Sequence, residues 1–127
     1  MIDLEKFKVF DFNEGLPYVS LTKNGMTFNK AVVMKLGYPA KVKMLIDEEE
    51  RLIAIQPCDE NDAKGTQFYK EKASGVLSVR WNSRDLINTV SEIGGWDLSQ
   101  SSYRINGTLL SEDKAMLFDL KTATLLG

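Results

Sequence analysis

Two stretches of this 127-residue chain follow the same order of expected elements, and this likeness constrains the fold more than any single motif. Each stretch reads as a strand, a short helix that ends at a glycine, and a hairpin with an acidic tip. The first strands begin 58 residues apart, at Tyr18 and Val76, and the closing glycines Gly37 and Gly94 lie 57 residues apart. A repeated unit lets one chain build by duplication what other proteins build by dimerisation.

The expected elements divide the chain into two copies and a connection between them. In the first copy they are a strand at 18–23, a helix at 28–37 and strands at 42–47 and 51–56. In the second they are a strand at 76–81, a helix at 83–94 and strands at 103–107 and 114–119. We predict a single domain over residues 1–127, with repeats at about 17–57 and 75–123 and a linker at 58–74. The fold class is mixed α+β and rich in strands.

Local signals place the turns and helix ends. Asn24 and Gly25 predict a two-residue hairpin turn, because both residues take positive φ readily. Thr27 or Asn29 is available to cap the first helix, and Gly37 is expected to end it with positive φ. In the second copy, Asn82 or Ser83 is available to cap the helix, and Gly94 is expected to end it with positive φ.

Alternation along 42–47 predicts that Val42, Met44 and Ile46 face the core while Lys41 and Lys43 face solvent. Phe68 and Tyr69 are expected to anchor the middle of the linker. Trp81 and Trp96 flank the second helix and are expected to pack against the core, since large aromatic side chains are mostly buried. Residues 7–12 are aromatic enough to add an edge strand.

Composition argues against an enzyme. The chain has no histidine, so it lacks the commonest general base and the commonest metal ligand. Its single cysteine, Cys58, cannot form an internal disulfide. The carboxylates at 47–50 and 59–62 fit no calcium-loop spacing and are expected at a hairpin tip and in the linker. We therefore expect no catalytic residues, no metal and no cofactor.

The termini and the charge distribution bear on location and partners. No secretion signal opens the chain and no stretch is long enough to cross a bilayer, so we expect a cytoplasmic protein with no membrane partner. The net charge is −2 and the pI is about 5.2. With the acids at 47–50 gathered at a tip, the rest of residues 17–57 forms a basic surface that can meet phosphate, although a solvated basic face is the commoner explanation.

One family shares the pattern of residues 24–56. The motifs NGMTF at 24–28, KLG at 35–37, VKMLID at 42–47 and LIAI at 52–55 resemble the swapped-hairpin domain of AbrB-type transition-state regulators and MazE-like antitoxins. The resemblance implies two βαββ units interlaced into one barrel, here fused as a pseudo-dimer as in tandem MraZ-like proteins. The chain departs from the family pattern at Met26, where the family has arginine, and near Asn29, where it has proline.

The resemblance also implies which residues touch DNA. Carried over by position, the basic residues of the family correspond to Lys23, Lys30, Lys35, Lys41 and Lys43. The matching places in the second copy are a mixed set: Arg80, Arg84, Asn88, Glu92 and Arg104.

Two functions remain open at this point. The first is a non-enzymatic DNA-binding transcription regulator of the AbrB type, with double-stranded DNA as its partner. The second is a protein-interaction module, antitoxin-like or part of an assembly, that uses the same barrel as a scaffold for a protein partner. In either case the oligomeric state is a monomer (pseudo-dimer) or a homodimer.

Overall fold

The computed structural model describes residues 2–7, 15–71 and 75–126, and it has the predicted strand-rich mixed α+β class. Within these ranges the strands are β1 (Tyr18–Thr22), β2 (Gly25–Phe28), β3 (Lys41–Asp47), β4 (Leu52–Pro57), β5 (Thr66–Gln67), β6 (Val79–Trp81), β7 (Ser102–Leu110), β8 (Ala115–Asp119) and β9 (Thr124–Leu126). The helices are α1 (Lys30–Lys35), α2 (Arg84–Gly94) and the 3-10 turns η1 (Leu4–Lys6) and η2 (Leu120–Thr122). The suggested edge strand at 7–12 lies largely outside the described residues.

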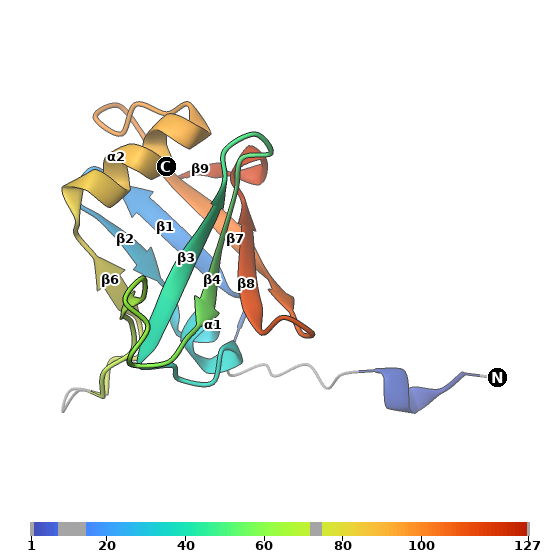
Figure 1. The fold of residues 1–127 in the computed structure, drawn as a ribbon. Coiled ribbons are helices and arrows are strands. Elements are labelled where there is room, and N and C mark those ends of the chain that lie inside the picture. The colour runs from blue at the N-terminus through green and yellow to red at the C-terminus, as the bar shows by residue number, and fades with distance from the viewer. Residues whose placement is uncertain (1, 8–14, 72–74, 127) are drawn as a thin grey trace.

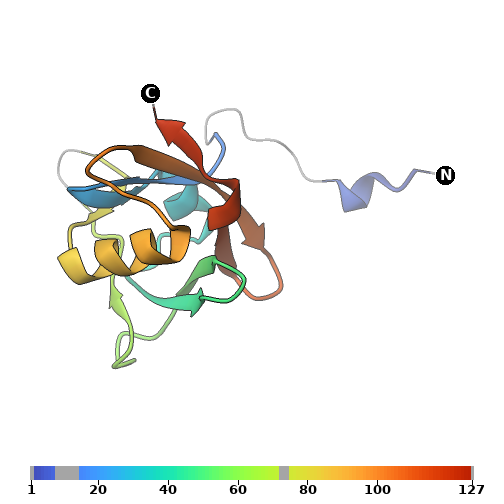
Figure 2. The same cartoon turned by 90° about the horizontal axis from the view of Figure 1, so that it is seen from above.

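All the strands join one antiparallel sheet that curls into a half-barrel (Figures 1 and 2). Their order is β5-β3-β4-β8-β7-β1-β2-β6, and β9 also pairs with β7. The helices α1 and α2 lie at opposite ends of the half-barrel, and the concave side holds the core. No helix within the described residues is long and apolar enough to cross a membrane.

The turn between β1 and β2 lies one residue before the predicted position. Thr22 pairs with Gly25, so the turn residues are Lys23 and Asn24, and neither Asn24 nor Gly25 has positive φ. The prediction of an Asn24–Gly25 turn is therefore wrong. Gly25 instead makes room for a neighbour, because a Cβ atom there would lie 2.5 Å from Nε of Arg80 on β6.

Both helices begin at a predicted cap. The Asn29 side chain accepts a hydrogen bond from the Val32 amide at 3.3 Å, and that of Ser83 accepts one from the Leu86 amide at 3.3 Å. Asn29 also binds the start of β1, since its Oδ1 accepts from the Tyr18 amide at 3.0 Å. One asparagine thus joins β1 to α1.

The helix ends agree with prediction in one copy and differ by one residue in the other. Gly37 has φ of 82°, as predicted. Gly94, however, is the last residue of α2, and the positive φ of 73° falls on Gly95. The prediction for Gly94 is therefore wrong: Gly94 lies under the Trp96 ring, and Gly95 turns the chain.

The hairpins β3–β4 and β7–β8 have matching loops. Asp47 pairs with Leu52 and Leu110 with Ala115, so each loop has four residues. The last loop residue has positive φ in both, 57° at Arg51 and 50° at Lys114. The returning strands β4 and β8 pair with each other, and their inward side chains are fully buried: Ile53, Ile55, Met116 and Phe118.

The β3–β4 hairpin extends past the core. Val42 is fully buried and Met44 is half-buried, as the alternation predicts. Ile46, which was also predicted to face the core, is 43% exposed. The core ends before this residue, so the tip of the hairpin has apolar side chains in contact with solvent.

The segment predicted as a linker folds against the sheet. β5 pairs with the start of β3, and the amide of Phe68 donates to the Ala40 carbonyl at 2.8 Å. Phe68 is 5% exposed and anchors the segment as predicted. Trp81 packs on Phe68 with ring centroids 5.8 Å apart, and Trp96 stacks on Tyr103 at 4.5 Å, so both tryptophans pack as expected.

Asp119 gives a pH-dependent prediction for the C-terminal end of the sheet. Lys121 Nζ lies 3.0 Å from the Asp119 carboxylate, which also accepts from the Lys121 amide at 3.0 Å, and these contacts lower the pKa of Asp119. A lowered folded-state pKa stabilises the fold above the unfolded pKa, and that stabilisation is lost as pH falls through the folded value.

We expect Asp119→Asn to lower the free energy of unfolding at pH 7 by less than about 1 kcal/mol, because the pair is exposed to solvent. The difference from wild type should shrink as the pH falls below the ordinary aspartate pKa, and urea titrations at pH 7 and pH 2 measure it. The exposed tip residue Asp113, changed to asparagine, serves as the control. An undiminished difference at pH 2 would show that the charge of Asp119 is not its source.

Candidate nucleic-acid interface

The convex face of β6, β2, β1 and β7 carries a row of polar side chains. Strand alternation turns Val19, Phe28, Val79 and Ile105 into the core, where they are at most 6% exposed. The residues between them point outward. These outward residues are Ser20 on β1, Thr27 on β2, Arg80 on β6 and Arg104 on β7.

The strand register aligns these four residues. Arg104 pairs with Ser20, Ser20 with Thr27, and Thr27 with Arg80. Thr124 on β9 pairs with Arg104 and extends the row. Three strand spacings of about 4.8 Å separate the two arginines, so they are about 14 Å apart along the sheet. We call Arg104, Ser20, Thr27 and Arg80 the arginine row.

Contacts within the chain hold each arginine in place. The Arg104 guanidinium carbon lies 4.0 Å from the centre of the Tyr18 ring, a cation–π contact. Arg80 Nη2 donates to the Asn24 carbonyl at 3.2 Å, and its Nε crosses close to Gly25. An ordered guanidinium loses less conformational entropy when it binds an anion.

The strands that carry the row hold no acidic residue. β1, β2, β6, β7 and β9 contain no aspartate or glutamate, although the chain as a whole has 18 acids. Lysines border the face at two places: Lys23 lies in the β1–β2 turn, and Lys30 follows β2 at the start of α1. The local charge is therefore positive on a protein whose net charge is −2.

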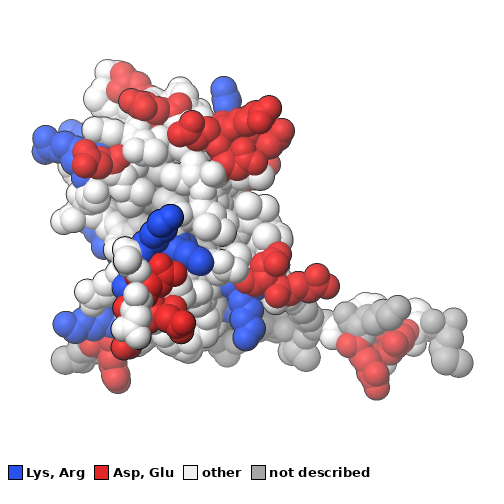
Figure 3. Space-filling model, in the orientation of Figure 1, with Lys and Arg blue, Asp and Glu red and all other residues white. Residues whose placement is uncertain are grey.

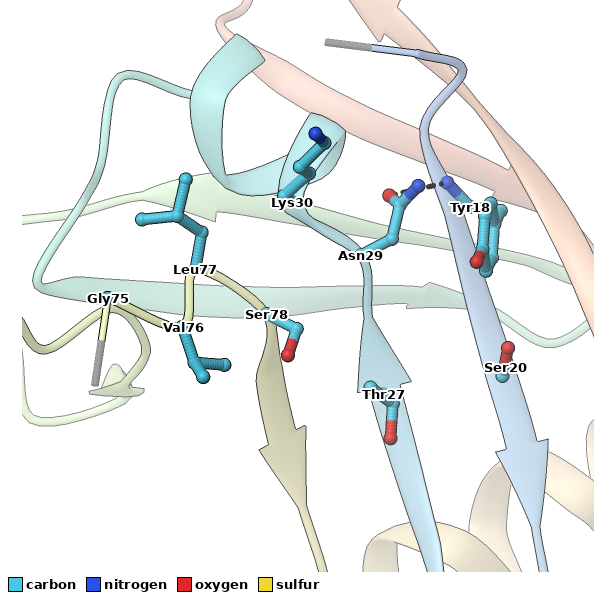
Figure 4. A pocket seen from close by; sticks show the side chains of 9 residues that line it. All are labelled: Tyr18, Ser20, Thr27, Asn29, Lys30, Gly75, Val76, Leu77 and Ser78. Carbon is cyan, nitrogen blue, oxygen red and sulfur yellow. Dashed lines mark hydrogen bonds between the residues drawn. The ribbon is translucent and has the colours of Figure 1, made fainter. Parts of the chain in front are cut away.

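A shallow cavity of about 540 Å³ lies beside the row (Figure 4). Its walls come from β1, from the end of β2 and from the segment that leads into β6. Ser20, Thr27 and Ser78 contribute hydroxyl groups, while Val76 and Leu77 give an apolar side. Hydroxyl groups next to cations are common partners of phosphate and sugar oxygens.

The structure divides the five lysines predicted from the family resemblance. Lys23 and Lys30 border the arginine row, and Lys35 ends α1 at the same end of the molecule as Lys30. Lys41 and Lys43 lie on β3, in the other half of the sheet, where the acidic segment 59–62 contacts them. Lys41 Nζ donates to the Glu60 carbonyl at 2.8 Å, and Lys43 Nζ lies 3.8 Å from Asp62 Oδ2.

The surface charge reflects this division. Figure 3 views the molecule from the side of β3, where acidic atoms gather at the tip of the β3–β4 hairpin. Lower on that side, basic and acidic atoms are intermixed. The side with β3 therefore offers a polyanion no continuous basic surface, in contrast to the strands of the arginine row.

The arginine row could not be assembled from the sequence. From the sequence, Arg80 and Arg104 are only the counterparts of lysines in the first copy. A local signal does exist, because each arginine sits next to a buried branched residue, Val79 or Ile105, and so must face outward. What the sequence does not contain is the pairing of β1 with β7 and of β2 with β6, which brings the two arginines into one row.

Within the described residues no three His, Cys, Asp or Glu side chains come close enough together to hold a metal ion. Comparison of the chain with protein-family models, with curated proteins and with solved structures finds no match.

Proposed function

We propose that this protein is a non-enzymatic DNA-binding protein, a transcription regulator of the AbrB type, which binds duplex DNA through the arginine row. The observation that carries the proposal is the acid-free face on which Arg104, Ser20, Thr27 and Arg80 align across four strands. The two arginines are separated by about 14 Å. This separation is close to the major-groove width of about 12 Å, so they suit phosphates on its two sides.

We further propose that the fold is a pseudo-dimeric, swapped-hairpin-like barrel built from two imperfect βαββ repeats. Two observations support this. The hairpin loops have equal length and place Arg51 and Lys114 in the same positive-φ position. The strands β4 and β8 pair around Ala54 and Leu117, which lie as far apart in the sequence as Arg51 and Lys114 do.

In this proposal the arginines bind the phosphate backbone and the row orients the protein. Guanidinium groups bind phosphate in a bidentate manner, and Lys23 and Lys30 add charge at the borders. Each neutralised phosphate releases condensed counterions, so the affinity must fall steeply as salt increases. The acidic surface near β3 is repelled by DNA, which leaves one orientation for the approach.

The test is the fluorescence anisotropy of a labelled pool of random duplex DNA, titrated with protein at about 50 and 200 mM salt. Wild type should bind saturably and lose affinity steeply at the higher salt. Replacing both Arg80 and Arg104 with alanine should reduce the slope of log K against log salt by about 2. The matched variant Lys41→Ala with Lys43→Ala removes two charges from β3 and should change the slope far less.

The outcomes separate the two sets of candidates. An equal loss in both double variants would mean that DNA contacts the lysines of β3 as well, as the family resemblance implies. A loss confined to the β3 variant would remove the arginine row from the proposal. No binding by wild type at low salt would overturn the DNA-binding function.

One observation favours the second candidate function, a protein-interaction module. Leu45 and Ile46 are 45% and 43% exposed on β3, which lies away from the arginine row. The two side chains lie on opposite faces of the strand, and apolar residues exposed on both faces favour contact with another protein chain. This surface does not compete with DNA binding, because it occupies another part of the sheet.

A further inference from the structure

β3 has a free backbone edge. On one side it pairs with β4 along its full length, from Val42 to Asp47. On the other side it pairs with β5 only at Lys41 and Val42. Between residue 43 and the hairpin tip, the described residues provide no strand on that side.

The alternation of hydrogen bonds shows which backbone groups lie on the free edge. The Lys41 carbonyl accepts from the Cys58 amide at 3.1 Å, so the groups of the odd-numbered residues point toward β4. The Ala40 carbonyl accepts from the Phe68 amide, so the even-numbered groups point the other way. The N–H and C=O groups of Met44 and Ile46 therefore face outward, with no backbone partner within the described residues.

Charged residues occur only at the two ends of this free edge, at Lys43 and Asp47. Proteins usually block such edges with proline, a bulge or charged residues. Here the middle of the edge holds Leu45, exposed on the convex face, and Ile46, exposed on the opposite face. A short apolar stretch that is exposed on both faces at Leu45 and Ile46, with charged residues only at its ends, is suited to pairing with another strand.

We propose that this edge pairs with the same edge of a second copy of the chain. The two β3 strands run antiparallel about a two-fold axis at Leu45, and they join the two sheets into one. The proposal is independent of DNA binding, because the arginine row lies on other strands.

Only one register of the two β3 strands uses the whole free stretch from residue 43 to residue 47. A two-fold axis at residue 45 pairs 43 with 47, 44 with 46 and 45 with itself, so all five residues from 43 to 47 take part. Centring on Met44 would place the partner's Ile46 opposite Val42, where β5 already pairs. Centring on Ile46 would bring in Glu48, which belongs to the loop and faces α2 across a cavity of about 330 Å³.

The chosen register also satisfies backbone and side chains together. Met44 and the partner's Ile46 form a hydrogen-bonded pair, as do Ile46 and the partner's Met44, so two exchanged bonds at each pair satisfy the free groups. Lys43 lies opposite the partner's Asp47, and Asp47 opposite the partner's Lys43. Opposite charges directly across a ladder are stabilising, so the partner's Asp47 adds to the contact that Lys43 makes with Asp62 of its own chain.

Cysteine cross-linking tests the register. Residue 45 meets its own copy in a non-hydrogen-bonded pair, where the Cα atoms lie about 4.5 Å apart, within the range that a disulfide spans. In a Cys58→Ser background, Leu45→Cys should form a covalent dimer under mild oxidation. Leu125→Cys is the matched control, since Leu125 is 66% exposed but lies on β9. Equal cross-linking by both variants, or none by Leu45→Cys, would overturn the proposal.

Analytical ultracentrifugation tests the association without cross-links. Wild type should dimerise as its concentration rises, and Leu45→Lys should raise the dissociation constant about tenfold or more because two like charges meet at the axis. Leu125→Lys should leave it unchanged. The single change Lys43→Asp should weaken the dimer, and adding Asp47→Lys should restore it. A monomer at all concentrations, or no recovery in the charge-swapped variant, would contradict the pairing.

Discussion

Replacing Phe28 with alanine is expected to lower the free energy of unfolding by about 3–5 kcal/mol. Phe28 is fully buried, and its ring centroid lies 5.0 Å from that of Trp81, 5.4 Å from Phe68 and 5.7 Å from Phe118. These partners come from β6, β8 and the segment after β5. Phe28 therefore bridges β6, β8 and the segment after β5, which share no backbone pairing with one another, and its loss leaves a cavity that they cannot all close.

Urea unfolding followed by tryptophan fluorescence measures this effect, and Phe7→Ala is the matched control. Phe7 is 66% exposed, so the same change there should alter the stability by less than about 0.5 kcal/mol. Small domains have a total stability of about 5–15 kcal/mol, so Phe28→Ala should remove a large part of it. A decrease in the free energy of unfolding below about 1 kcal/mol would mean that the aromatic cluster contributes little to the stability of the core.

The second large effect is expected at Trp81, which joins the two edges of the curled sheet. β5 and β6 are the end strands of the sheet order, and no backbone pairing connects them. Trp81 on β6 donates from Nε1 to the Gln67 carbonyl on β5 at 3.1 Å, and its ring packs on Phe68. We expect Trp81→Ala to cost about 3 kcal/mol or more, because both the ring and the bond are lost.

A conservative variant separates the two contributions. Trp81→Phe keeps an aromatic ring but removes the donor, and we expect it to cost about 1 kcal/mol. Trp96→Ala is the third variant and provides the comparison, because Trp96 stacks on Tyr103 away from the junction of β5 and β6. Calorimetric melting of the three variants gives the order of stabilities. If Trp81→Phe were as damaging as Trp81→Ala, the single hydrogen bond and not the packing would hold the edges together.

The sequence predicts the β3–β4 hairpin and the helix caps well, because their signals are local. The strand expected at 42–47 corresponds to β3, which begins one residue earlier, and Asn29 and Ser83 act as helix caps as predicted. Short-range periodicity and capping chemistry require nothing from the rest of the chain.

The errors have a common physical cause, which is contact with distant residues. An Asn-Gly pair favours a turn at those two residues, yet Gly25 pairs inside β2, where the Arg80 side chain crosses it. Ile46 fits the inward alternation of β3. The extent of the core depends on other strands, however, and the core ends before this residue. The candidate site also depends on contacts between residues far apart in the sequence. Arg80 and Arg104 become neighbours of β2 and β1 only because strands from the two halves of the chain pair.

The sheet order also determines when the chain can fold during its synthesis. β1 pairs with β7, β2 with β6, and β4 with β8, so each of these three first-half strands keeps one unpaired edge until the second half leaves the ribosome. At about 5–20 residues per second, that delay lasts several seconds. During this interval β4 exposes Ile53 and Ile55, which the native core covers completely. Nascent chains that stop before β8 should therefore be the form that aggregates or recruits chaperones.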